Sequence, residues 1–357
     1  MFSDAISSWL LFLSDPEPDS THSSAVHVPR KRLTAAQAIE LWSLARQHGV
    51  TGAVSARWNS ICQRAGQECI VSAMDRQETA ALTQAIRAAR GDWFGFVASA
   101  LFLRSRTRQV LGAFDRQGVS AIVIKGEDFA DRLYRQPGLR PFRDIDLLLS
   151  PEDYRAANDM LPGLGFRASE ADLKHSEGYG EISWTSMTPP EVSLETHWNL
   201  INSPAQRRQT SVTLANLALT ETTVDGRRGL RPTPASLLLM ASVHAVLGHR
   251  FDRLQQLCDI RQICRGTAGS IDEAWLREAA RETGATTALA AGLEVTSRLL
   301  GDADSAGLLQ RLRLQRPHGI QAGVSRWLVG PQTLLHPEAP FSKFRRTLVR
   351  EWMKRAA

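Results

Sequence analysis

Hydrophobic and polar positions follow a helical period from Thr34 onward. Thr34 is a suitable helix N-cap, and Ala38 and Trp42 follow at a spacing that places them on one helix face. Gly49 is expected to end this helix, and an apolar stripe over residues 75–117 predicts one or two more helices. The folded part of the chain is therefore predicted to begin as a helical region.

The period changes at Val119, where a short run of β-branched residues lies between Gly118 and Gly126 and predicts a buried strand. Further along, Pro151 is suited to open a helix, because proline is favoured at the first helical position. This middle region is expected to contain strands at 119–124, 144–149, 181–187 and 191–198, and helices at 127–135 and from Pro151.

Helical spacing returns after Pro234, with helices predicted at 235–248, 252–265, 272–282 and 285–300. The pattern as a whole predicts an α+β protein: a small mixed β-sheet of about four or five strands, flanked by N-terminal and C-terminal helical regions. The expected segments are an N-terminal helix and linker at 1–33, a helical region at 34–117, the sheet core at 118–204, a C-terminal helical domain at 205–300 and an extension at 301–357.

Composition narrows the class of protein only slightly. Of the 357 residues, 43% are hydrophobic and 22% are charged, which is ordinary for a globular protein and excludes collagen-like and wholly disordered chains. The net charge of +6 is mild, and most of it lies in residues 343–357, so a nucleic-acid partner is not favoured. Those residues predict a basic amphipathic helix, which either contacts an anionic partner or membrane surface or docks on the helical arm.

Cysteine usage and the N-terminus bear on the compartment. The four cysteines form no C-x-x-C pair, which favours reduced thiols in the cytoplasm over a disulfide framework. The apolar stretch at 5–13 lacks a preceding basic residue and is followed by acidic residues, so a short docked helix is expected rather than a signal peptide. A cytoplasmic protein is the resulting expectation.

Two carboxylates mark the start of the predicted strand at 144–149. Asp144 and Asp146 are two residues apart, so on a strand both side chains lie on the same face. Two acids at one end of an apolar strand repel each other, and a bound cation such as Mg²⁺ would relieve that repulsion. An ordinary strand end with two solvated acids is the alternative.

A third carboxylate follows on the last predicted strand, where Ser193, Glu195 and His197 share one face. Adjacent strands lie about 4.8 Å apart, so Glu195 could converge on the two aspartates. Three carboxylates on neighbouring strands can hold two Mg²⁺ ions about 3.5–4 Å apart, an arrangement that serves phosphoryl displacement. Lys125 and Gly126, between a strand and a helix, could meet phosphate through a point charge and a close backbone approach.

These motifs, in this order, resemble the uncharacterised bacterial nucleotidyltransferase family of the polymerase-β-like nucleotidyltransferase superfamily. The strand-Lys-Gly-helix, the Asp-x-Asp strand and the Glu-x-His-Trp strand are the most specific. The segment at 42–50 looks like the family's N-terminal helical signature, and His244 to His249 looks like part of its C-terminal one. The resemblance covers about residues 34–300.

The resemblance implies roles for individual residues. It makes Asp144, Asp146 and Glu195 the catalytic and metal-binding acids, with two Mg²⁺ ions expected and Mn²⁺ as an alternative. It implies nucleotide contacts for Lys125, Gly126 and Arg140, and supporting positions for His197 and Arg143. The alternative for Arg140 is an ion pair with Asp144 or Asp146.

The implied activity is transfer of a nucleoside monophosphate from a nucleoside triphosphate to an acceptor hydroxyl on a small molecule, peptide, protein or RNA end, in a peptide natural-product or toxin-like system. The alternative is a catalytically inactive relative that serves as an interaction module in a biosynthetic or toxin–antitoxin operon. All three acids are present, which favours the enzyme.

Two weaker signals are left with ordinary interpretations. His244 and His249 are five residues apart, about 140° around an α-helix, so they are expected to face different ways as core or capping histidines. His175 lies in a predicted loop from which it could face the cleft.

Overall fold

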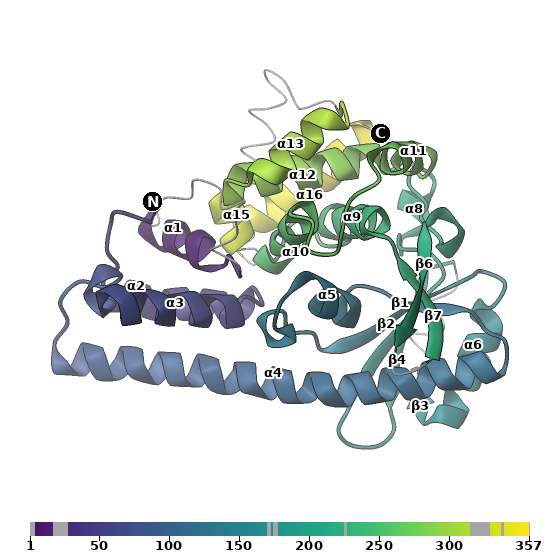
Figure 1. The fold of residues 1–357 in the computed structure, drawn as a ribbon, viewed down its shortest axis with the longest axis horizontal. Helices are drawn as coiled ribbons and strands as arrows, with labels where there is room; N and C mark the ends of the chain where they lie inside the picture. The colour runs from purple at the N-terminus through teal and green to yellow at the C-terminus, as the bar shows by residue number, and fades with distance from the viewer. Residues whose placement is uncertain are drawn as a thin grey trace.

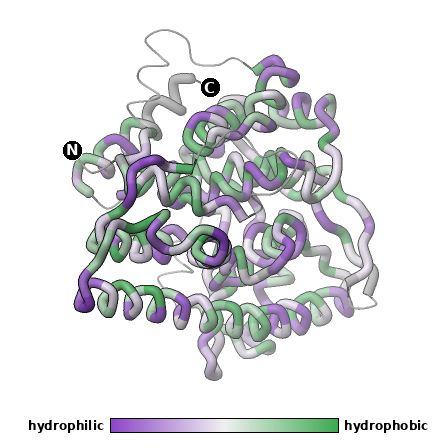
Figure 2. Tube along the Cα trace, turned by 60° about the vertical axis from the view of Figure 1, so that its left-hand side comes forward, coloured by the Kyte–Doolittle hydropathy of each residue, from purple (hydrophilic) through white to green (hydrophobic). Residues whose placement is uncertain are grey.

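The computed structural model describes residues 4–16, 28–169, 173, 178–224, 227–314, 329–336 and 339–356. A single long helix, α4 (Arg76–Arg116), supports the N-terminal helices at one end and the sheet at the other (Figure 1). Asp75 begins it with a capping box in which Glu78 reciprocates. Hydrophobic and hydrophilic residues alternate along α4 (Figure 2), as expected of a helix with one buried face.

The N-terminal helices pack side by side above α4. Helix α1 buries Trp9 and Leu10 completely, so the expected docked helix is present. Thr34 caps α2 with a capping box, as the sequence predicts. The elements of this region are α1 (Asp4–Leu13), α2 (Ala35–Gln47), α3 (Thr51–Ala65) and η1 (Gln67–Cys69).

The sheet has five strands in the order β1-β2-β5-β4-β3, within the predicted number. Strands β2 and β5 pair in parallel at its centre, and the other neighbours pair antiparallel, so the sheet is mixed as expected. The strands are β1 (Ala121–Val123), β2 (Asp144–Leu149), β3 (Phe166–Arg167), β4 (Glu181–Ser186) and β5 (Ser193–His197). The short strand β3 is the one member that the periodicity does not predict.

The two faces of the sheet belong to different hydrophobic clusters. Ile145 and Leu194 pack on one face with residues of α4 such as Phe114. Leu148 and Ile124 lie on the opposite face, in one cluster with the C-terminal helices. Asp146 and Glu195 share the face of Leu148 by strand alternation, so the C-terminal helices cover the face that carries the carboxylates.

Short helices connect the strands of the core. They are α5 (Gly126–Leu133), η2 (Pro137–Leu139), α6 (Tyr154–Met160), η3 (Pro162–Leu164), α8 (Pro204–Arg207) and η4 (Leu214–Asn216). Helix α6 begins three residues after Pro151, because residues 151–153 form a turn rather than the first helical turn.

A β-hairpin that the sequence analysis does not predict leads into the C-terminal helices. Its strands contain few apolar residues, so they carry no period-2 hydrophobic signal, although Asp225-Gly226 is a hairpin dipeptide. The elements are β6 (Leu219–Val224), β7 (Arg227–Pro232), α9 (Pro234–Val243), a π-helical turn η5 (His244–Gly248), α10 (Leu254–Cys264), α11 (Glu273–Glu282), α12 (Thr286–Leu300), α13 (Ala303–Arg311), α15 (Pro331–Leu335) and α16 (Pro340–Ala356).

The basic C-terminal segment forms α16, as predicted. Leu348 packs against the main hydrophobic cluster, whereas Phe341 and Phe344 are exposed. The side chains of Val349 and Trp352, two other apolar residues of this amphipathic segment, lie outside the described residues, as does His175. Within the described ranges, no helix combines the length and the apolar character that crossing a membrane requires.

Candidate active site

The carboxylates meet at the centre of the sheet because β2 and β5 are neighbours in register. Asp146 lies directly opposite Glu195, and Asp144 lies opposite Ser193. Asp146 is buried, with 5% of its surface exposed, whereas Asp144 and Glu195 are partly exposed. This register brings Glu195 beside Asp146, whereas Asp144 lies one pair further along the strand and outside the group of ligand atoms formed by Asp146, Glu195 and His197.

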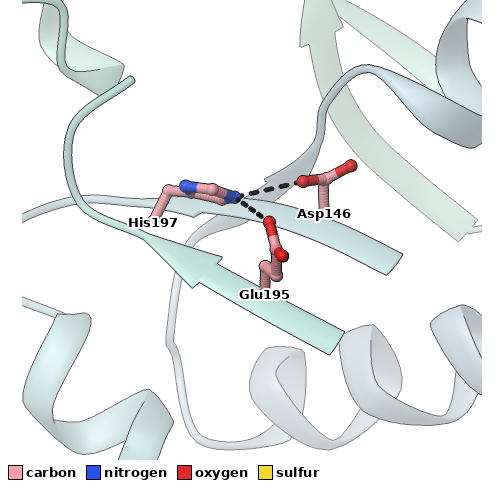
Figure 3. Close-up of side chains that lie close together, drawn as sticks. All are labelled: Asp146, Glu195 and His197. Carbon is pink, nitrogen blue, oxygen red and sulfur yellow. Dashed lines mark hydrogen bonds and ion pairs between the residues drawn. The ribbon is translucent and has the colours of Figure 1, made fainter. Parts of the chain in front are cut away.

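His197 directs one edge of its ring at both Asp146 and Glu195 (Figure 3). Its Nε2 is 3.1 Å from Asp146 Oδ1 and 3.5 Å from Glu195 Oε2, and its Nδ1 is 3.3 Å from Glu181 Oε2. Burial and the nearby Lys125 charge lower the pKa of His197, but its three carboxylate partners outweigh both and raise that pKa to about 10. In this arrangement, His197 is an imidazolium that neutralises part of the carboxylate charge.

Lys125 supplies a second cation. Its Nζ lies 2.9 Å from Asp146 Oδ1, and its main chain has φ 53°, a left-handed conformation that is costly for a residue with a side chain. Burial lowers the pKa of Lys125, but attraction to Asp146 and Glu195 outweighs burial and raises it. Strained main chain of this kind is concentrated at functional sites, where the surrounding structure sustains it.

Negative charge exceeds positive charge in this cluster. Burial raises the pKa of Asp144 to about 6, and repulsion by Asp146 and Glu195 adds to the shift. Burial also opposes ionisation of Asp146, but Lys125 and His197 outweigh it and hold its pKa well below the usual value. Asp144, Asp146, Glu195 and Glu181 therefore face two protein cations, and the site has the electrostatics to accept a further cation.

The residues predicted to contact nucleotide lie at the start of α5. Gly126 is buried, and a Cβ at this position would lie 3.3 Å from Phe142 Cβ, so the close approach favours glycine. Arg140 is also buried and directs all three of its guanidinium nitrogens to protein groups. Nε and one terminal nitrogen donate to Asp259 at 2.9 and 2.8 Å, and the other donates to the Gly126 carbonyl at 3.0 Å.

This arrangement makes Arg140 a bridge between the Lys125-Gly126 turn and α10. Asp259 also accepts a hydrogen bond from Tyr134 Oη at 2.7 Å. The ion-pair partner is thus Asp259, and neither Asp144 nor Asp146 is bonded to the guanidinium among the described residues. The nucleotide contact implied for Arg140 stays a prediction.

Arg143, expected to support the acids, is exposed, and its guanidinium lies 4.3 Å from the centre of the Phe96 ring on α4. This cation–π interaction holds Arg143, the residue directly before β2, against α4. No bond from Arg143 to a carboxylate is present among the described residues. Its supporting role also stays a prediction.

Sequence reasoning missed Glu181, the fourth carboxylate, which pairs with His197 across β4 and β5. The signal was present, because Glu181, Ser183 and Thr185 alternate with Ile182 and Trp184 on a predicted strand. Placing Glu181 opposite His197 requires the register of the hairpin around Pro189-Pro190, which strand alternation alone does not supply.

A cavity of about 970 Å³ lies beside the outer edge of β1, away from the carboxylate cluster. Glu127 and Asp128 of α5 line it, and Arg231 of β7 lies opposite. Burial raises the pKa of Asp128 to about 6, although Arg132 opposes the shift. The carboxylate cluster and this cavity therefore flank the Lys125-Gly126 turn as separate features.

The histidines of the C-terminal region lie on η5. The expectation that His244 and His249 face different ways is wrong: their rings are in contact, with centres 4.4 Å apart. The reason is the π-helical turn, in which the His249 amide donates to the His244 carbonyl at 3.0 Å and brings residues five apart onto one side.

Comparison with known proteins identifies the family to which the chain belongs. The sequence pattern of a family described as uncharacterised nucleotidyltransferases matches residues 34–301, three-quarters of the chain and nearly the span that the motifs predict. The chain belongs to this family. The match covers the carboxylate strands, the Lys125-Gly126 turn and η5 of this nucleotidyltransferase family member.

No curated protein matches the chain. Among solved structures, the chain is similar to an antigenic nucleotidyltransferase-like protein from Paracoccidioides brasiliensis, with 14% identity and a TM-score of 0.36. That match covers 57% of this chain and 91% of the other. A match with so low an identity and TM-score supports no conclusion about the fold or the chemistry of this chain.

Proposed function

We propose that this family member transfers a nucleoside monophosphate from a nucleoside triphosphate to an acceptor hydroxyl, with divalent metal ions bound at Asp144, Asp146 and Glu195. The observation that carries the proposal is the cluster of ligand atoms. One ligand atom each from Asp146, Glu195 and His197 lies within 4.8 Å of the others, at the centre of a sheet in a nucleotidyltransferase family member.

The donor set fits a hard divalent cation. Carboxylate oxygens are the ligands that Mg²⁺ prefers, and Mn²⁺ accepts the same oxygens, whereas His197 would bind a metal only after releasing its ring proton. The carboxylates of the site outnumber its protein cations, and this excess of negative charge favours binding of a metal ion. We therefore infer two Mg²⁺ ions, with Mn²⁺ as a substitute, which would supply charge stabilisation for the displacement when bound.

The chain's own residues position the reactants. Lys125 offers its ammonium to the triphosphate, and the main chain at Gly126 opens the N-terminus of α5 toward the same phosphates. Charge stabilisation and positioning are the main contributions that phosphoryl transfer requires from a protein.

In the proposed reaction, the acceptor oxygen forms a bond to the α-phosphorus while the bond from that phosphorus to the bridging oxygen of the leaving pyrophosphate breaks. The acceptor proton passes to a carboxylate, which we assign to Glu195 because its side chain is 29% exposed, whereas that of Asp146 is 6% exposed. Pyrophosphate then leaves. We further expect the protein to work in the cytoplasm, since its four cysteines are free.

The test is label transfer. Each nucleoside triphosphate, labelled at the α-phosphate, is incubated with Mg²⁺, a cell extract and either the wild-type protein or Asp146→Asn. The matched control is Asp159→Asn, an exposed carboxylate on α6 at the opposite face of the sheet.

Label on an extract component with wild type and Asp159→Asn, but not with Asp146→Asn, supports the proposal. Equal transfer by Asp146→Asn overturns the assignment of the site. No transfer by wild type, together with no binding of any triphosphate, overturns the proposed enzyme and favours the interaction module.

A further inference from the structure

Helix α10 presents three polar residues on one face, spaced i, i+4 and i+7: Gln255, Asp259 and Gln262. Asp259 and Gln262 are buried. Gln255 Nε2 donates to the Pro141 carbonyl at 3.0 Å, and Gln262 Nε2 donates to the Leu133 carbonyl at 2.9 Å. This polar face is therefore bonded to both ends of the segment that joins α5 to β2.

Asp259, in the middle of that face, reaches the Lys125-Gly126 turn through Arg140. Its carboxylate accepts bonds from Nε and from one terminal nitrogen of the guanidinium, a two-point contact that fixes the orientation of the group as well as its position. The other terminal nitrogen donates to the Gly126 carbonyl at 3.0 Å, and the guanidinium carbon lies 5.2 Å from the centre of the Phe129 ring. Arg140 therefore joins α10 to the first turn of α5.

The turn that Arg140 contacts is strained and needs restraint from its surroundings. Lys125 has φ 53° and ψ −121°, a conformation outside the regions that a residue with a side chain ordinarily adopts. Such a conformation persists only where the surrounding structure over-determines it. On the strand side of the turn, the Ile124 amide donates to the Asp146 carbonyl at 3.0 Å. On the helix side, the bond from Arg140 to the Gly126 carbonyl supplies a restraint.

Stability alone does not require charged groups at this place. A buried ion pair is often no more stabilising than apolar residues of similar volume, because both charges lose their hydration. Arg140 and Asp259 are only 7% and 2% exposed, and apolar residues of α10 such as Leu257 and Ile260 lie in the main hydrophobic cluster. The pair supplies what apolar side chains cannot, a directed hydrogen bond to the Gly126 carbonyl.

We propose that Asp259 is a positioning residue of the candidate active site: through Arg140, it holds the Lys125-Gly126 turn in the conformation that receives the phosphates of a nucleoside triphosphate. The inference rests on the proposed function. Arg140 acts on the nucleotide through the turn, since each of its three guanidinium nitrogens bonds to a protein group. A helix of the C-terminal region thereby controls the geometry of the turn assigned to the triphosphate.

The test measures binding of a non-hydrolysable nucleoside triphosphate in the presence of Mg²⁺. One variant combines Tyr134→Phe, Arg140→Met and Asp259→Leu, which removes the bond to Gly126 without leaving a buried charge unpaired. A second variant, Asp259→Asn, keeps the size of the side chain. Tyr134→Phe alone is the matched control, because it removes one bond to Asp259 but leaves Arg140 bonded to both of its partners. Urea unfolding confirms which variants are folded.

We expect the dissociation constant of the triphosphate to rise at least about tenfold in the triple variant, because a released turn misplaces both Lys125 and the N-terminus of α5. Tyr134→Phe should stay within about threefold of wild type. The triple substitution is also made in a Lys125→Ala background. If Asp259 acts through the turn, the two losses overlap, and the triple substitution should weaken binding there by less than about threefold. A merely structural role gives the same fold-loss in both backgrounds.

Unchanged triphosphate affinity in the folded triple variant, or an equal fold-loss with and without the Lys125 side chain, overturns the inference while the proposed function stands. If the triple variant does not fold, Asp259→Asn is measured in both backgrounds and the same two outcomes decide. Failure of wild type to bind any triphosphate overturns the proposed function and this inference with it.

Discussion

Removal of the Asp259 carboxylate should destabilise the protein far more than removal of an ordinary surface charge. Asp259 accepts three hydrogen bonds in the interior, two from Arg140 and one from Tyr134 Oη. Asp259→Ala leaves the Arg140 guanidinium buried, with only 7% of the residue exposed and one remaining bond, to the Gly126 carbonyl.

The size of the expected loss in unfolding free energy follows from the burial of the Arg140–Asp259 ion pair. Truncating one partner of a buried, hydrogen-bonded ion pair costs about 3–5 kcal/mol, because the other charge stays desolvated without compensation. Tyr134 adds a buried hydroxyl without an acceptor, worth about 1–3 kcal/mol when water cannot reach it. We therefore expect Asp259→Ala to lower the free energy of unfolding by at least about 3 kcal/mol.

Urea unfolding followed by circular dichroism measures this change. The matched control is Asp159→Ala, because Asp159 and its partner Arg155 have side chains that are 74% and 94% exposed. An exposed pair contributes about 0–1 kcal/mol, so the control should lie close to wild type.

A second variant separates charge burial from loss of packing. Replacing the whole network by apolar residues, with Tyr134→Phe, Arg140→Met and Asp259→Leu combined, should recover most of the lost stability because no charge is left unpaired. If Asp259→Ala unfolds within about 1 kcal/mol of wild type, or the triple variant is less stable than Asp259→Ala, the reasoning about this buried pair is wrong.

Three further changes test other parts of the structure. Burial raises the pKa of Asp128 from 3.8 to about 6, so the native state binds this proton more tightly and loses about 3 kcal/mol of stability as pH rises from about 4 to 7. Asp128→Asn should remove this contribution to the pH dependence of the unfolding free energy, measured by urea unfolding at several pH values between about 4 and 7. A pH dependence equal to that of wild type refutes the prediction. Gly284→Ala should destabilise by at least about 2 kcal/mol in thermal unfolding, because φ is +69° and a Cβ would lie 1.9 Å from the Gln209 carbonyl oxygen. Asn158→Ala should lower the free energy of unfolding by about 1–3 kcal/mol, since its side chain accepts the buried Trp184 indole N–H at 3.0 Å; urea unfolding at the wild-type midpoint contradicts this.

The acids of the site could be placed from sequence because each step is local. Alternation puts Asp144 and Asp146 on the same side of their strand and Glu195 and His197 on the same side of theirs, and pairing of these two strands then brings both sets onto one face of the sheet. The resemblance to the nucleotidyltransferase family supplied the adjacency, which alternation by itself does not.

What the sequence could not provide depends on long-range contacts or on irregular backbone. The bond between Arg140 and Asp259 joins residues 119 apart, and no local pattern marks either as the partner of the other. The contact between His244 and His249 depends on a π-helical turn, whereas the prediction assumed 3.6 residues per turn. In both cases tertiary packing, rather than propensity, decides the geometry.

The central claim is a metal-dependent triphosphate site at Asp146, and equilibrium binding tests it without knowledge of the acceptor. Isothermal titration calorimetry of a non-hydrolysable nucleoside triphosphate analogue is carried out with Mg²⁺ and with excess chelator, on wild type and Asp146→Asn. The account predicts binding to wild type only with Mg²⁺, and a loss of at least about tenfold in affinity in Asp146→Asn. Equal binding by wild type with and without Mg²⁺, or equal binding by Asp146→Asn and wild type, would contradict it.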